Sequence, residues 1–198
     1  MKKHKGTLFV ISAPSGTGKT TLVNAILSEK GQNEKIEQVV TYTTKKPRNG
    51  EINGKSYYFL TKDEFEAKIA QNFFLEWSDV YDNYYGSPRY ALDKLTEGIS
   101  QIAILDRTGA KAVKQIYPPS ILIWIETPNI EELAKRLTKR ASDSSESIIR
   151  RLALAIKEIE AEKVEQLYDY TIINDDFEKA KQALKSILFQ RIDAEKTL

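Results

Sequence analysis

The 198-residue sequence carries 30 basic and 28 acidic residues, a formal net charge of +2 at pH 7, and 41% hydrophobic residues. This balance argues against general nucleic-acid binding and is typical of a globular α/β domain with a buried core. With no cysteine and one histidine, the chain excludes disulfides, thiolate metal sites and histidine-based metal clusters. No apolar run approaches the roughly 20 residues of a membrane span, and residues 1–6 lack the apolar stretch of a signal peptide, so we expect a cytoplasmic protein without a membrane partner.

The first predicted elements are a buried strand over residues 7–11, a glycine-containing loop, and a helix that begins near Lys19. Gly16 and Gly18 allow the backbone to turn its N–H groups inward, where the positive end of the helix dipole also favours an anion. The Lys19 ammonium would reach the β- and γ-phosphates, and the Thr20 hydroxyl could ligate Mg²⁺. A plain glycine turn is the alternative. The spacing predicts a nucleotide-phosphate site made of Ser15, Gly16, Thr17, Gly18, Lys19, Thr20 and Thr21, with Thr20 as the metal ligand.

A strand over residues 36–42 leads into a loop in which three cations fall within residues 45–48. A solvated basic turn before a hairpin is one interpretation. The other is a phosphate site for a second substrate, because arginine and tyrosine hydroxyls suit an acceptor phosphate.

A short helix over residues 63–71, an apolar stretch at 73–77 and an aromatic turn at 80–88 complete a small inserted region. Its aromatic residues could simply form a small core. Glu76 stands in the apolar stretch, however, and a buried carboxylate needs a hydrogen-bond partner, such as the edge of a guanine base.

The second half of the chain alternates strands with helices. The strand at 101–105 ends in Asp106, which could cap the following helix or face a ligand at the sheet edge. Arg151 lies near the start of a long helix, where a cation opposes the dipole unless an anion is near. Helices are predicted at 88–96, 109–116, 130–139, 146–167 and 177–194, strands at 121–125 and 170–173, and a hinged segment at 141–145.

Alternating strands and helices predict an α/β fold, a parallel sheet with helices on both faces. We expect one domain in which residues 1–35, 88–135 and 168–198 form the core. An acceptor-binding insertion would cover about 36–87, and a helical lid about 136–167. These features predict a phosphoryl transferase that uses a nucleoside triphosphate.

In its motifs the sequence resembles the guanylate kinase family of P-loop nucleoside monophosphate kinases, over essentially its full length after Lys5. The phosphate loop alone is shared by many families, whereas the other motifs in this order are specific to this one. The resemblance rests on residues 14–21, Thr43-Thr44-Lys45-Lys46-Pro47-Arg48-Asn49-Gly50-Glu51 with Gly54 and Tyr57, Glu76-Trp77, Asn83-Tyr84-Tyr85-Gly86-Ser87, Asp106 with Gly109, Arg136-Leu137 with Arg140, and Asn174-Asp175-Asp176.

The resemblance implies a P-loop kinase fold and the reaction ATP + GMP = ADP + GDP with Mg²⁺, and dGMP as a possible alternative acceptor. It further implies that Glu76 and Asp106 accept hydrogen bonds from guanine N1–H and the 2-amino group. By the same resemblance, the GMP phosphate would be bound by Lys45, Arg48, Tyr57 and Tyr85, with Glu51 in the same motif. The surroundings of guanine O6 would be formed by Thr41 and Ser87. The ATP phosphates would be bound by Arg136, Arg140 and Arg151, and the adenine would lie near Asn174.

Two departures from the family pattern bear on activity. Lys45 stands where the family usually has a second arginine, so a point charge replaces a bidentate fork. Ile104 stands where the family usually has another acid near the magnesium. A guanylate-kinase-like binding module with weak or no turnover, and a kinase of this fold for another small phosphorylated acceptor, are therefore the alternatives. A monomer or homodimer is expected.

Overall fold

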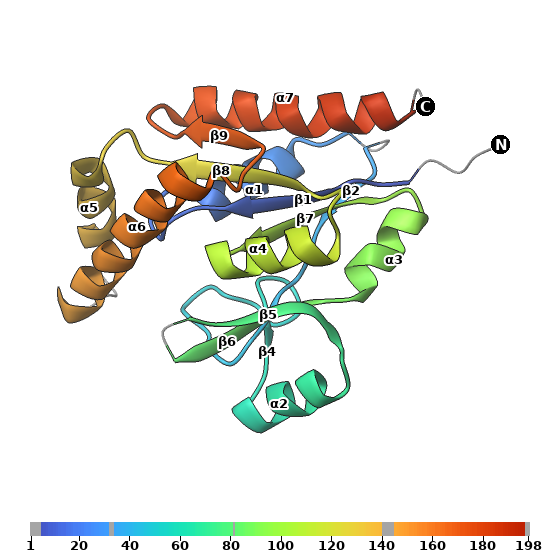
Figure 1. Ribbon diagram of the computed structural model, residues 1–198, viewed down its shortest axis with the longest axis horizontal. Coiled ribbons are helices and arrows are strands. Elements are labelled where there is room, and N and C mark those ends of the chain that lie inside the picture. Colours follow the sequence, from blue (N-terminus) through green and yellow to red (C-terminus); the bar gives the residue numbers. More distant parts are fainter. Residues whose placement is uncertain (1–4, 32–33, 81, 140–144, 197–198) are drawn as a thin grey trace.

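The computed structural model describes residues 5–31, 34–80, 82–139 and 145–196. Strands and helices alternate through most of this chain, and Figure 1 shows them as a large sheet between helices, with a smaller sheet below it. The strands are β1 (Leu8–Ser12), β2 (Ile36–Gln38), β3 (Tyr42–Thr43), β4 (Tyr58–Phe59), β5 (Phe74–Val80), β6 (Asn83–Pro88), β7 (Ser100–Leu105), β8 (Ile121–Glu126) and β9 (Tyr170–Ile173). The helices are α1 (Lys19–Ser28), α2 (Lys62–Ala70), α3 (Tyr90–Thr96), α4 (Arg107–Ile116), α5 (Ile130–Thr138), α6 (Ser145–Glu165) and α7 (Phe177–Lys196).

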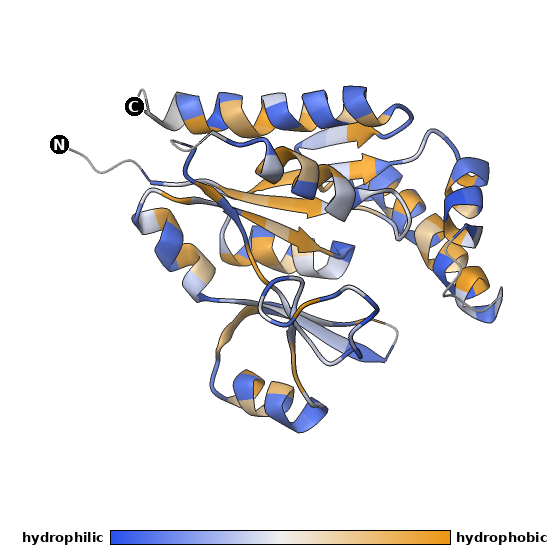
Figure 2. Ribbon diagram, turned by 180° about the vertical axis from the view of Figure 1, so that it is seen from behind, coloured by the Kyte–Doolittle hydropathy of each residue, from blue (hydrophilic) through white to orange (hydrophobic). Residues whose placement is uncertain are grey.

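The large sheet is parallel, in the order β2-β7-β1-β8-β9, which confirms the predicted α/β fold. Successive side chains of the central strand β1 point to opposite faces. Phe9 and Ile11 pack in one core cluster with residues of α1 and α7, whereas Leu8 and Val10 pack in another with residues of α3 and α4. Helices therefore cover both faces, and Figure 2 shows hydrophobic residues concentrated in the strands between them.

The strands β1 and β7 both end at the carboxyl edge of the large sheet. Ser12 lies opposite Leu105, so the phosphate loop and Asp106 begin side by side at the carboxyl edge of the sheet. In parallel α/β sheets, ligands bind at this edge. Asp106 is the N-cap of α4, and its Oδ1 accepts a hydrogen bond from the N–H of Gly109 at 2.9 Å. The helix therefore begins at Arg107, two residues earlier than predicted.

The small sheet has the order β4-β3-β6-β5, and two of its strands differ from the prediction. The strand expected over residues 36–42 is divided, because β2 pairs with β7 in the large sheet whereas β3 pairs with β6. The aromatic turn expected at 80–88 is mostly the strand β6, antiparallel to β5. The turn itself is short and includes Asp82 at φ +61°.

Helices α5 and α6 lie beside the carboxyl edge of the sheet, at the left of Figure 1. Leu133 and Leu137 of α5 pack with Ala155 of α6 in a separate small core cluster. The predicted hinged segment at 141–145 lies outside the described residues except for Ser145, which begins α6. Among the described helices, none combines the length and the apolarity needed to cross a bilayer.

Candidate active site

The phosphate loop has the backbone that its glycines predict. Gly16 and Gly18 adopt φ values of +97° and +94°, in the left-handed region that favours glycine. A Cβ at Gly16 would also lie 2.9 Å from Leu137 Cδ2, so α5 packs closely on the loop. Lys19 lies at the first position of α1, and its Nζ donates hydrogen bonds to the carbonyl oxygens of Ala13 and Pro14. The loop thus holds the ammonium group against its own backbone.

Asn174 supports this loop from behind. Its side chain is buried, and its amide nitrogen donates to the carbonyl oxygen of Thr17 at 2.6 Å. A Cβ on Gly18 would lie 2.8 Å from the same nitrogen. The amide nitrogen that was expected near adenine is thus committed to the loop backbone, because that buried carbonyl requires a donor. In this structure Asn174 is a residue that shapes the phosphate loop.

A cavity of about 200 Å³ opens between the phosphate loop, the small sheet and α6. Its walls bring together predicted residues from both expected phosphate sites and from the expected base site. These are Ser15, Lys19, Thr20, Thr41, Tyr57, Glu76, Tyr85 and Asp106. The lining also includes Ile104, which the resemblance places near the magnesium, and residues that sequence reasoning did not assign to a site, namely Ala13, Ser78, Val80, Leu105, Leu154 and Glu158.

Two carboxylates face this cavity near the first turn of α4. Glu76 is 5% exposed, and its Oε1 accepts a hydrogen bond from the backbone N–H of Ser87 at 3.1 Å. Gly109 in α4 leaves room for it, since a Cβ there would lie 2.7 Å from Glu76 Oε2. Asp106 Oδ2 accepts a hydrogen bond from the Ser78 hydroxyl. Asp106 is therefore both the cap of α4 and part of the cavity wall, so its role as a cap is confirmed and its contact with a ligand stays a prediction.

Burial changes the ionisation of Glu76. The loss of solvation raises the pKa of its carboxyl group to about 7, and the negative charge of Asp106 acts in the same direction, whereas hydrogen bonds from Ser87 oppose the shift. The ionised form of a carboxyl group with this pKa is poorly solvated in the ligand-free protein. A ligand that donates hydrogen bonds to the carboxylate would stabilise that form.

The raised pKa of Glu76 predicts a pH-dependent stability difference between the wild type and Glu76→Gln. The folded-state pKa of about 7 exceeds the unfolded value of 4.5, so folded wild type binds more protons between these values and loses stability as pH rises through this window. Glutamine does not titrate. Urea unfolding should show Glu76→Gln gaining roughly 3 kcal/mol relative to wild type between pH 4 and pH 8. A difference that is constant with pH would contradict the raised pKa.

Of the predicted acceptor-phosphate residues, Tyr57 and Tyr85 line the cavity. Lys45 forms an ion pair with Glu51, and its Nζ lies 4.7 Å from the centroid of the Tyr57 ring. Glu51 also accepts a hydrogen bond from the backbone N–H of Arg48 at 2.8 Å. Glu51 therefore organises the loop that carries Lys45 and Arg48. Its own negative charge would repel a phosphate group. Arg48 is exposed and lies close enough to Tyr85 to oppose the rise in the pKa of the Tyr85 hydroxyl that burial causes.

The predicted lid arginines take different positions. Arg151 lies in the second turn of α6, and its Nη1 donates to Ser15 Oγ of the phosphate loop at 3.1 Å. Arg136 instead pairs with Glu132 of its own helix at 3.0 Å, because residues four apart on a helix are neighbours. Arg140 lies outside the described residues. Of the lid arginines that the structure describes, Arg151 is the one that contacts the phosphate loop.

Three other predicted residues do not line the cavity. Ser87 is buried, and its backbone N–H donates to Glu76, while its expected place in the surroundings of guanine O6 stays a prediction. Thr17 is also buried, and its hydroxyl donates to the carbonyl oxygen of Pro14 at 3.1 Å. Thr21 is exposed on α1.

Two of the residues missed from sequence could have been found by periodicity. Ser78 is two positions after Glu76 on one strand, so both side chains lie on the same face. Glu158 is seven positions after Arg151 on one helix, which likewise puts both on one face. In each case the spacing points to the site only when the first residue of the pair, Glu76 or Arg151, is already assigned to it.

The glycine loop lies at the carboxyl edge of a parallel sheet, and a lysine begins the helix that follows it. The loop shares a cavity with the small sheet and α6. This arrangement defines the class of P-loop nucleotide kinases. The family model for guanylate kinase matches residues 5–191. The chain belongs to the guanylate kinase family.

Individual relatives agree with this assignment. The chain is 46% identical over 188 residues to the guanylate kinase of Protochlamydia amoebophila, covering 94% of this chain and 92% of the relative. It is 44% identical over 185 residues to that of Shewanella violacea, covering 93% and 87%. The crystal structure of guanylate kinase from Anaplasma phagocytophilum superposes with a TM-score of 0.77 at 30% identity, covering 96% of this chain and 87% of that one.

Proposed function

We propose that this protein transfers the γ-phosphoryl group of ATP to GMP and releases ADP and GDP. One observation carries the proposal: the phosphate-loop residues Lys19 and Thr20 line the same cavity as two carboxylates, the buried Glu76 and the partly buried Asp106. Two acceptors beside a phosphate site suit guanine, which offers an N1–H and a 2-amino group on one edge. Adenine offers neither of these donors, so AMP would leave the carboxylates without partners and would be rejected.

The roles of the phosphate-binding residues follow from their positions. Lys19 and the N–H groups of the loop would hold the β- and γ-phosphates, and Arg151 would approach them from the lid beside Ser15. Arg48, Tyr57, Tyr85 and Lys45 would bind the phosphate of GMP on the opposite side of the cavity. The protein would then act mainly by holding the two phosphates in line and by countering their charge.

Magnesium fits the oxygen-rich chemistry of this site. Among the described residues no group of three histidine, cysteine, aspartate or glutamate side chains could hold a metal, but the exposed Thr20 hydroxyl lines the cavity. Mg²⁺ typically takes one or two protein ligands together with phosphate oxygens and waters. When bound, it would neutralise charge on the β- and γ-phosphates.

We also propose that the small sheet binds GMP and that the segment from α5 through α6 acts as a lid, as the sequence suggests. Closure of such a lid would exclude water from the γ-phosphoryl group. The proposal places the protein in the cytoplasm as a monomer or homodimer, with ATP and GMP, or dGMP, as its small-molecule partners.

The function can be tested with the purified chain, Mg-ATP and a panel of GMP, dGMP, AMP, CMP and UMP, by coupled detection of ADP. GMP should be the best acceptor, and kcat/KM for AMP should be lower by roughly 10⁴-fold, as for other sites that hydrogen-bond a specific donor. Faster turnover with a non-guanine acceptor would favour a different kinase. Tight GMP binding by calorimetry without ADP formation would favour a binding module.

Ser78 should contribute to base selection through Asp106. Removing its hydroxyl in Ser78→Ala takes one hydrogen bond from Asp106 Oδ2, at a cost of about 1 kcal/mol in holding that carboxylate. We expect the preference for GMP over IMP, which lacks the 2-amino group, to fall about fivefold while KM for ATP is unchanged. Ser28→Ala, at an exposed position in α1, is the matched control. An unchanged GMP/IMP ratio would show that Ser78 does not position Asp106.

A further inference from the structure

One face of α6 borders the active site from Arg151 to Glu158. Arg151 contacts Ser15 in the phosphate loop, and Leu154 and Glu158 line the cavity. Residues three, four and seven apart lie on the same side of a helix, so these side chains form one continuous row. The same row continues to Glu162 and Glu165, beyond the cavity.

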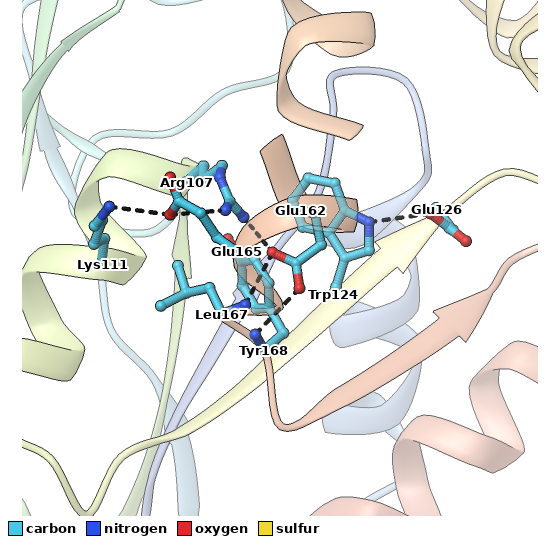
Figure 3. Close-up of polar contacts among 8 residues, drawn as sticks. All are labelled: Arg107, Lys111, Trp124, Glu126, Glu162, Glu165, Leu167 and Tyr168. Atoms are coloured by element: carbon cyan, nitrogen blue, oxygen red, sulfur yellow. Dashed lines mark hydrogen bonds and ion pairs between the residues drawn. The ribbon is translucent and has the colours of Figure 1, made fainter. Parts of the chain in front are cut away.

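The far end of this row is fixed to α4 by ion pairs, which Figure 3 shows. Arg107 pairs with Glu162 and, at 3.1 Å, with Glu165, while Lys111 reaches Glu165 at 3.0 Å. Arg107 follows Asp106 directly in sequence, so α6 is anchored next to a carboxylate of the proposed guanine site. Glu162 also accepts hydrogen bonds from the backbone N–H groups of Leu167 and Tyr168, each at 3.3 Å.

Glu158 lies one turn before Glu162 and lines the cavity. Burial raises the pKa of its carboxyl group above the usual range, as does the negative charge of Asp106, whereas the positive charges of Lys19 and Arg107 lower it. Glu158 is thus close enough to Lys19 to feel its charge. Ile104, two residues before Asp106 on β7, lines the same cavity and offers no acceptor for an ammonium group.

We propose that Glu158 is a positioning residue that orients the Lys19 ammonium group toward the transferred phosphoryl group, the task that an acidic side chain in place of Ile104 could otherwise perform. The inference rests on the proposed kinase function and adds a residue to it. The carbonyl oxygens of Ala13 and Pro14 hold Lys19 from the loop side, and Glu158 attracts it from the lid side. Because Glu158 is carried by α6, Lys19 is correctly oriented only when this helix is docked.

Four variants test the proposal: Glu158→Gln, Ile104→Asp, the double variant, and Glu160→Gln as a control at an exposed position on α6. Glu158→Gln should lower kcat by about 10- to 100-fold, the scale of a misplaced catalytic group, with KM for GMP within about twofold of wild type. Its melting temperature should equal or exceed that of wild type, because an amide is less costly to bury than a carboxylate. Glu160→Gln should leave kcat unchanged.

The double variant should recover at least about tenfold of the lost kcat, because the Ile104→Asp substitution would return a carboxylate to the wall shared with Lys19. An unchanged kcat in Glu158→Gln, a loss of kcat accompanied by a lower melting temperature, or a double variant no better than Glu158→Gln would each overturn the proposal. Wild type serves as the reference throughout. If it fails to phosphorylate GMP with Mg-ATP, the proposed function fails whatever the variants do.

Discussion

Replacing Lys19 with alanine is expected to lower GMP-dependent ADP formation by on the order of 10³-fold, the loss seen when a preorganised electrostatic group is removed from a transition state. The ammonium group lies at the mouth of the phosphate loop, where its described hydrogen bonds go to loop carbonyl oxygens. Charge builds up on the transferred phosphoryl group during the reaction, and neutral alanine cannot counter it. The reduction should therefore appear mainly in kcat.

The same substitution should leave the protein folded. The core clusters beneath the loop contain Leu22, Val23 and Ile26 from α1 but not Lys19, so the apolar packing is retained. Circular dichroism and thermal unfolding should match those of wild type. Lys55→Ala, at an exposed lysine in the acceptor loop, should retain full turnover. Turnover of Lys19→Ala above one tenth of the wild-type value would remove Lys19 from the phosphate-transfer step.

The phosphate loop could be predicted from sequence because its signals are local. Glycines at two fixed positions, a β-branched run before them and a helical pattern after them lie within a few residues of one another. The φ values of Gly16 and Gly18 follow directly from those positions. The parallel sheet was equally accessible, since alternation of strands and helices constrains topology through right-handed crossovers.

The contacts that complete the site depend on residues far apart in the chain. The strand expected at 36–42 is divided because its first part pairs with β7 and its end pairs with β6. A local sequence pattern does not contain these two distant pairing partners. Ser78 meets Asp106 across 28 residues, and Arg151 meets Ser15 across 136. Arg136 shows the reverse case, since its described ion pair is with Glu132, four residues away on the same helix, and its contact with the ATP phosphates stays a prediction. Residue type and spacing predicted which groups could act, but not which of them the fold brings together.

Glu76→Gln should weaken GMP binding by about 30-fold while ATP affinity changes less than twofold. A hydrogen bond to a charged acceptor contributes about 2 kcal/mol, and the amide would present either a weaker acceptor or an N–H group that opposes the donors of guanine. The Ser87 N–H can still donate to the amide oxygen, so the local backbone should not change. The loss should be confined to the base site, because Glu76 lies on β5 of the small sheet and its described hydrogen bond is with Ser87 of β6, not with the phosphate loop.

Isothermal titration calorimetry of GMP and, separately, of a nonhydrolysable ATP analogue measures this difference. Because burial raises the pKa of Glu76 to about 7, wild-type affinity for GMP should fall as pH decreases below 7, when the carboxyl group must lose its proton to bind guanine. The affinity of Glu76→Gln should lack this component, so the two proteins should converge at low pH. Glu37→Gln, at an exposed position in β2, should behave as wild type. Equal losses for both nucleotides, or unchanged GMP affinity at pH 8, would place Glu76 outside the guanine site.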